Sequence, residues 1–217
     1  MVSWSEMFDP EWAEEYERWL ARMNETLPAL QAKRDTLVED IRAAFSEVSR
    51  KGGTSLAEVE PLDAGANERQ CKRIRAQQRD KHWSEVDLRK HDPCGIGPAF
   101  LDPIGYRYHL PAYMIDQLTV GNHDLDGVEH DPWNGQDMII FSLTSTSEWS
   151  GEKHNLLNAS QRRCVARFLA LYVELMQSTH FEGKPDDVYL ALINIWWDDL
   201  PVEDREHLNS IWPGRFY

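Results

Sequence analysis

The densest run of side chains that could ligate a metal lies between Gly121 and Pro132. It contains His123, Asp124, Asp126, Glu129, His130 and Asp131. Alternating carboxylates followed by a glycine are typical of a calcium loop, but the third acidic position and the closing glutamate are misplaced here. The histidines also lack the spacing of a zinc site. We therefore predict no metal, and we interpret this segment as a solvated or partner-facing acidic loop.

Nucleophilic catalysis would need a serine or cysteine beside a general base on a rigid turn. The sequence has no Gly-x-Ser-x-Gly, and Cys94, with His91 nearby, lies in a loop rich in proline and glycine. The segment Cys94-Gly-Ile-Gly-Pro98 ends in proline where a phosphate-binding loop would open onto a helix with a lysine. We therefore predict no catalytic residue and no cofactor.

Arg107 stands among aromatic residues that could line a small pocket. Its neighbours in the sequence are Tyr106, Tyr108 and Tyr113. An arginine buried in the fold, tying loop carbonyls together, accounts for the same residues. An enzyme or small-molecule binder using this pocket is thus the alternative to a protein without chemistry.

Acidic side chains dominate the polar composition. The chain of 217 residues has 37 Asp and Glu against 23 Lys and Arg, a formal net charge of −14. Such a surface repels phosphate backbones and anionic lipids and attracts basic proteins. Aromatic residues beside carboxylates are typical of protein interfaces. The predicted partner-binding surface consists of Asp124, Asp126, Glu129, Asp131, Asp186, Asp187, Trp196, Trp197, Asp198 and Asp199. Ordinary solvation plus core tryptophans is the competing interpretation.

The cysteines and the hydropathy of the chain also indicate where in the cell the protein is expected. Cys71, Cys94 and Cys164 are isolated, which argues against a disulfide framework or a zinc ribbon. We find no signal-peptide pattern at the N-terminus and no apolar run long enough to span a bilayer. We expect a cytoplasmic protein without membrane or direct nucleic-acid contact. In residues 66–90, where basic side chains outnumber acidic ones, we predict an exposed helix from Asn67 to about Lys81.

Helical periodicity recurs along the chain. A first helix is predicted to begin at Asp9-Pro10 and to end at Asn24–Pro28, with a second from about Leu30 to Val48. Ser55-x-x-Glu58 and Asn158-x-x-Gln161 each predict a capped helix start. Residues 138–143 are predicted as a lone strand or buried extended segment. The first helix carries an aromatic stripe that we interpret as a docking face: Trp12, Tyr16, Trp19, Leu20 and Met23.

The segment Phe100–Tyr113 concentrates aromatics, prolines and a glycine. Proline presets φ and glycine tolerates a positive φ, so Pro103 and Gly105 predict a turn. Leu110-Pro111 then predicts the start of a new helix. We interpret the segment as a structural corner made by Pro103, Gly105, Arg107, Pro111 and Tyr113.

This segment resembles a known bacterial family, a domain of unknown function. That family pairs an FLxPxGxRYYLPAY segment with a later FxxLTxxQxxxVxxFL helix. Here the corresponding stretches are Leu101-Asp-Pro-Ile-Gly-Tyr-Arg-Tyr-His-Leu-Pro-Ala-Tyr-Met114 and Phe141-Ser-Leu-Thr with Leu157-Asn-Ala-Ser-Gln-Arg-Arg-Cys-Val-Ala-Arg-Phe-Leu169. His109 replaces the second tyrosine of the pair. The resemblance covers roughly residues 36 to 175 and implies no known activity. Members resemble small proteins that are sometimes found among bacterial toxin-immunity and defence genes.

Together these features predict a mainly α fold, an irregular multi-helix bundle with at most one minor β element. We expect one domain over residues 1–217, with an appended helix at 9–25, a family-like core at about 36–175 and acidic helices at 185–217. The leading hypothesis is a non-catalytic acidic binding protein, an immunity-type inhibitor that occludes a basic toxin or nucleic-acid-processing partner. A helical subunit of a larger complex is a further alternative. The oligomeric state and the identity of the partner stay open.

Overall fold

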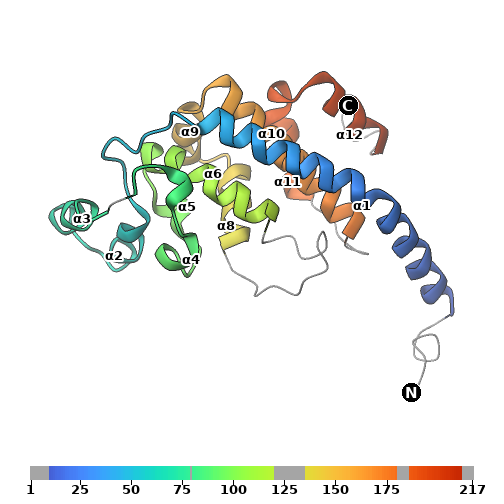
Figure 1. Ribbon diagram of the computed structural model, residues 1–217, viewed down its shortest axis with the longest axis horizontal. Coiled ribbons are helices and arrows are strands. Elements are labelled where there is room, and N and C mark those ends of the chain that lie inside the picture. The colour runs from blue at the N-terminus through green and yellow to red at the C-terminus, as the bar shows by residue number, and fades with distance from the viewer. Residues whose placement is uncertain (1–9, 79, 120–134, 180–185, 212–217) are drawn as a thin grey trace, which may run out of the picture.

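The computed structural model describes residues 10–78, 80–119, 135–179 and 186–211, and these ranges contain helices but no strand (Figure 1). The predicted mainly α class is therefore confirmed. In chain order the elements are α1 (Pro10–Phe45), η2 (Leu56–Glu58), α2 (Val59–Asp63), α3 (Glu68–Arg75), η3 (Trp83–Glu85), α4 (Leu88–His91), α5 (Gly97–Phe100), α6 (Pro103–Thr119), α8 (Gly135–Thr144), α9 (Glu148–Asn155), α10 (Ala159–Thr179), α11 (Asp186–Ala191), η4 (Leu192–Trp196), η5 (Trp197–Asp199) and α12 (Val202–Ile211).

The two longest helices, α1 and α10, pack along each other and form the spine of the molecule (Figure 1). The contact buries a stripe of α1 side chains at helical spacing, including Leu37, Ile41 and Phe45. Each such side chain contributes about 1.5–3 kcal/mol by leaving water. Helix α6 packs on α1 as well, so the spine fixes the position of the segment that carries the family motif.

Helix α1 is continuous where the sequence predicted two helices separated at Asn24–Pro28. Pro28 lies inside it. A proline removes one backbone hydrogen bond and usually ends a helix at the residue before it. Pro28 is an exception, because the helix continues through it. The first turns of α1 extend beyond the other described elements (Figure 1). The aromatic stripe at residues 12–23 lies where side chains are outside the described structure, so its role as a docking face stays a prediction.

The family motif folds as one helix, α6, which corrects the predicted turn and second helix start. Pro103 begins α6 and Pro111 lies inside it, where it leaves the carbonyl of Arg107 without its helical donor. Gly105 lacks the positive φ found at Gly52 and Gly65. A Cβ at residue 105 would instead collide with the carbonyl oxygen of Thr54. Glycine is needed there because another chain segment comes close.

Residues 138–143, predicted as a strand, belong to helix α8. Ile139, Ser142 and Leu143 are buried while Phe141 is exposed, which is a helical and not an alternating pattern. A short apolar run cannot be distinguished from a buried helix by periodicity alone. The predicted caps are confirmed: Ser55 with Glu58 begins η2, and Asn158 with Gln161 begins α10. The predicted basic helix is confirmed over α3 but ends at Arg75.

Candidate functional site

The three tyrosines of the motif project from α6 to different neighbours. The Tyr106 hydroxyl pairs with Ser142 Oγ at 2.9 Å, Tyr108 donates to Asp80 Oδ2 at 3.0 Å, and Tyr113 donates to Asp92 Oδ2. Burial raises the pKa of each phenol, so all three stay protonated. They bind α6 to surrounding segments and do not line one pocket.

Arg107 is half-buried, and its Nε donates to Gln161 Oε1 at 3.0 Å. The amide of Gln161 in turn donates to the carbonyl of Ala44 at 3.1 Å. Through Gln161, Arg107 therefore links α6 to the start of α10 and to the end of α1. The expected bonds from Arg107 to loop carbonyls are not among those described. Arg107 and the three tyrosines thus bond to four different segments, and a small-molecule pocket around them stays a prediction.

Two carboxylates hold loops against α6. Asp102 Oδ1 accepts from the backbone N–H of Gly105 at 2.7 Å and from that of Thr54 at 3.2 Å. Buried Asp92 accepts from the N–H of Gly97 at 2.8 Å and from the hydroxyl of Tyr113. These bonds hold the chain at Thr54 and at Asp92–Gly97 against α6. Leu56, two residues after Thr54, and His91, just before Asp92, line the cavity described next.

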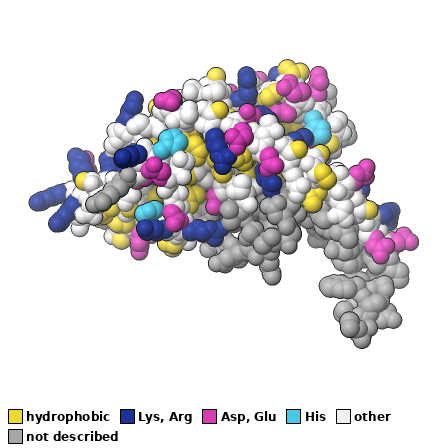
Figure 2. Space-filling model, in the orientation of Figure 1, with side chains coloured by type: hydrophobic (Ala, Val, Ile, Leu, Met, Phe, Trp, Pro, Cys, Tyr) yellow, Lys and Arg dark blue, Asp and Glu magenta, His cyan; other side chains and the backbone are white. Residues whose placement is uncertain are grey.

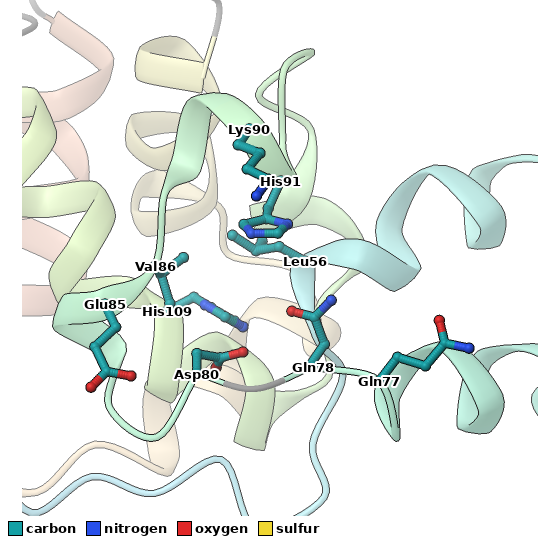
Figure 3. Close-up of a pocket in the computed structure, with 9 residues that line it drawn as sticks. All are labelled: Leu56, Gln77, Gln78, Asp80, Glu85, Val86, Lys90, His91 and His109. Atoms are coloured by element: carbon teal, nitrogen blue, oxygen red, sulfur yellow. The ribbon is translucent and has the colours of Figure 1, made fainter.

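A cavity of about 360 Å³ opens beside α6 (Figure 3). In the close-up, the ring of His109 points from α6 into the space that the Gln78 amide and the Asp80 carboxylate also face. Its walls come from η2, the chain around residues 77–86, α4 and α6: Leu56, Gln77, Gln78, Asp80, Glu85, Val86, Lys90, His91 and His109. The site therefore combines segments that are distant in the sequence.

His109 is only 2% exposed, and neither ring nitrogen has a hydrogen-bond partner within the described part of the chain. Burial, with the nearby charges of Arg50 and His91, lowers the pKa of His109 to about 3. The ring is therefore neutral at physiological pH, with one donor and one acceptor nitrogen. Arg50 Nη1 is also buried without a partner among the same described residues, while its guanidinium lies over the Tyr108 ring.

The C-terminal part of the predicted partner surface divides into buried and exposed residues. Trp196 is fully buried, donates to the carbonyl of Leu143 at 2.9 Å and packs under the guanidinium of Arg162. Its assignment to a binding surface is wrong, because it belongs to the core. Asp199 forms an ion pair with Arg162 at 2.6 Å, which gives it a structural role. Asp198 is exposed, as predicted.

Of the remaining predicted surface residues, only Trp197 has a described side chain. Asp124, Asp126, Glu129 and Asp131 fall in residues 120–134, outside the described structure. Asp186 and Asp187 begin α11, although their side chains are not described, and Trp197 is half-buried. Their part in binding a partner stays a prediction.

The core contains several buried polar groups, only some of which the sequence indicated. Glu58, which is fully buried, binds Arg75 and the backbone N–H of Ser55. Lys153 donates to the carbonyl of Pro98 at 2.7 Å, and burial lowers its pKa to about 8. The capping box with Ser55 predicted a role for Glu58, whereas nothing in the local sequence distinguished His109 or Lys153 from surface residues.

The described residues contain no cluster of three or more His, Cys, Asp or Glu side chains able to hold a metal ion. None of the described helices combines the length and the apolar character required to cross a bilayer. These two findings do not cover residues 120–134, where metal-ligand side chains are densest in the sequence, because they lie outside the described structure.

Comparison with known proteins identifies a family. No curated protein and no solved structure matches the chain. A family model covers residues 33–200, which include α6, the cavity and the buried Trp196. The match extends past residue 175, where the resemblance was expected to end, and so takes in α11 and the turns after it. The chain belongs to DUF6714, a family of unknown function.

Proposed function

We propose that the protein is a non-catalytic binding protein whose acidic surface recognises a basic partner protein. In the specific form of this proposal it is a bacterial, cytoplasmic immunity-type inhibitor that occludes a basic toxin or a nucleic-acid-processing protein. The observation that carries the proposal is the separation of charge along the chain. Residues 66–90 contain eight Lys and Arg against four Asp and Glu, a net charge of +4. Because the whole chain has a net charge of −14, the residues outside this segment carry −18.

The separation is visible on the surface. Lys and Arg gather at the end of the molecule formed by α3, and carboxylates are prominent at the opposite end near α12 (Figure 2). At that acidic end Asp198, Glu203 and Glu206 are exposed on η5 and α12. Exposed charges of one sign raise the association rate with an oppositely charged partner, and salt screens them over about 8–10 Å.

Neighbouring carboxylates at the same end serve the fold. Asp199 pairs with Arg162, and Asp204 Oδ2 lies 3.4 Å from Arg167 Nε. These pairs orient η5 and α12 on α10. Variants that test partner binding therefore have to spare Asp199 and Asp204.

The test combines the substitutions D198N, E203Q and E206Q in one variant and measures how that variant captures a purified basic partner. The partner is first recovered from a lysate of the native host, and association kinetics are then recorded over a salt series. The triple variant should lower the on-rate several-fold at low salt, leave the melting temperature within about 2 °C, and flatten the salt dependence. The matched control K72Q/R73Q changes exposed charges on α3 and should leave the on-rate unchanged or faster.

The proposal makes the role of Arg107 distinct from that of the tail. R107A should lower stability through loss of the bond to Gln161, with little specific effect on capture. A recovered partner that is acidic, or capture indifferent both to salt and to the triple variant, would contradict the proposal.

A second candidate function, a helical subunit of a larger complex, is favoured by the extension of the first turns of α1 beyond the other described elements (Figure 1). Its test is the oligomeric state in the native host after deletion of residues 1–25. Loss of a large assembly on deletion would support a subunit, and an unchanged elution position would exclude docking through this segment.

A further inference from the structure

The cavity beside α6 contains buried hydrogen-bonding groups that the protein itself leaves without partners. Buried polar atoms in folded proteins are nearly always paired, and an exception calls for a physical explanation. Both ring nitrogens of His109 are exceptions within the described structure, and the ring points into the cavity (Figure 3). His154 provides the contrast: it is buried to a similar extent, 4% exposed, but its Nε2 lies 3.1 Å from the carbonyl of Ser142.

The other lining residues define the chemistry that fits. The Gln78 amide, half-buried at the wall, offers a donor and an acceptor and makes no side-chain hydrogen bond to the described residues. Leu56 and Val86 add apolar surface, suited to the face of a ring. The charged lining groups are of both signs: Asp80 is bonded to Tyr108, Glu85 accepts from the backbone N–H of Lys81, and Lys90 is exposed.

The wall carries two carboxylates and one ammonium, and both carboxylates already accept hydrogen bonds from the protein, so the lining does not single out an anion or a cation. A cavity of about 360 Å³ is in the size range of small-molecule sites, which combine apolar walls with a few placed polar groups. A neutral imidazole and a primary amide are complementary to a heterocycle edge that carries donors and acceptors.

We propose that this cavity binds a small uncharged heterocycle of the nucleobase or nucleoside class, and that His109 and Gln78 hydrogen-bond its polar edge. The site is independent of the acidic surface at the other end of the molecule. Binding here and capture of a basic protein can therefore fail separately.

The experiment uses the full chain with adenine, adenosine, guanosine, cytidine and uridine as probes at millimolar concentration. At least one probe should raise the melting temperature by about 2 °C or more, increasing with concentration, because a ligand that binds only the folded state stabilises it. The same probe should shift the ring ¹⁵N resonances of His109 and leave those of His154 in place. Absence of any thermal or ¹⁵N response across the panel would overturn the proposal.

The variant H109F separates ligand binding from fold. Phenylalanine keeps the ring volume and removes two unpartnered nitrogens, so the ligand-free variant should melt at or above the wild-type temperature. Its affinity for the active probe should fall at least tenfold. The matched variant H154F loses a satisfied hydrogen bond and should melt lower while keeping wild-type affinity.

A second variant covers the possibility that H109F does not fold. Q78L removes the amide at the half-buried wall and should lower affinity for the same probe at least tenfold without a change in fold. Wild-type affinity in either folded variant, H109F or Q78L, would place the ligand elsewhere and refute the assignment of this cavity.

Discussion

Gly105→Ala tests why the first turn of α6 needs glycine. An ideal Cβ at this residue would lie under 3.0 Å from the carbonyl oxygen of Thr54 and 3.0 Å from Asp102 Oδ1. Overpacking of this kind costs about 1–3 kcal/mol. Displacing Asp102 also weakens an N-terminal cap worth about 0.5–2 kcal/mol. The gain from replacing glycine in a helix, about 0.5–1 kcal/mol, offsets only part of this.

The net loss of unfolding free energy for G105A is therefore about 2.5 kcal/mol. For a chain of this size that corresponds to a melting temperature about 5–10 °C lower. Thermal unfolding followed by circular dichroism at 222 nm measures it. The strain arises from the approach of residues 53–54, because Gly105 has no positive φ. A larger side chain at Gly53, where an added Cβ would lie 2.6 Å from the Gly105 nitrogen, should act in the same direction.

Gly151 provides the matched control, because it lies inside α9 and an added Cβ meets nothing within 4 Å. G151A should raise stability by about 0.5–1 kcal/mol, the ordinary gain for alanine over glycine in a helix. Opposite signs for the two variants support the close-approach explanation. If G105A melts within about 1 °C of the wild type, or if G151A loses as much as G105A, the reasoning is refuted.

Two further predictions concern buried titratable groups. Burial alone would raise the pKa of Glu58, but the hydrogen bonds from Arg75 and Ser55 outweigh burial and lower the pKa from 4.5. The stability that ionised Glu58 provides should therefore be lost as the pH falls below 4.5. Between pH 7 and pH 3, the midpoint of urea unfolding should fall less in E58Q than in the wild type. Cys94 is exposed while Cys71 and Cys164 are buried, so a thiol reagent should label one cysteine rapidly in the native protein and all three after unfolding, and equal native rates would contradict this assignment.

The parts of the fold predicted correctly are those governed by local chemistry. The caps at Ser55–Glu58 and Asn158–Gln161 involve residues three apart, so the sequence alone contains both partners. In the described parts of α1 and α10, apolar side chains at helical spacing are buried as expected, from Leu30 to Phe45 and from Val165 to Val173. Helix class follows from such signals because each depends on neighbours along the chain.

The errors occur where distant segments decide. Pro28 and Pro111 carry local signals for a break or a start, yet packing of α1 on α10 and of α6 on its neighbours keeps both helices continuous. Trp196, next to Asp198, resembled an interface anchor, but α8 supplies the carbonyl that binds its indole N–H. No property of the local sequence reports that a carbonyl from residue 143 will be present.

The candidate cavity is the extreme case of this dependence on distant segments. Its walls come from η2, the chain between α3 and α4, α4 itself and α6, so no spacing rule could have collected them. The sequence offered one clue to this cavity: His109 stands where the family motif has its second tyrosine. That clue became informative only when the burial of the ring and the absence of a described partner were known.

The motif on α6 therefore separates into a scaffold and one unsatisfied position. Asp102, Tyr106, Arg107, Tyr108 and Tyr113 each have a hydrogen-bond partner on another segment of the chain. Their bonds account for where the surrounding loops lie. His109 differs, since its ring is held in place between these anchored neighbours while both nitrogens are buried without a partner among the described residues. A helix anchored this thoroughly can keep a neutral imidazole aimed into a cavity without any bond of its own, which is the preorganisation that selective recognition of a small ligand requires.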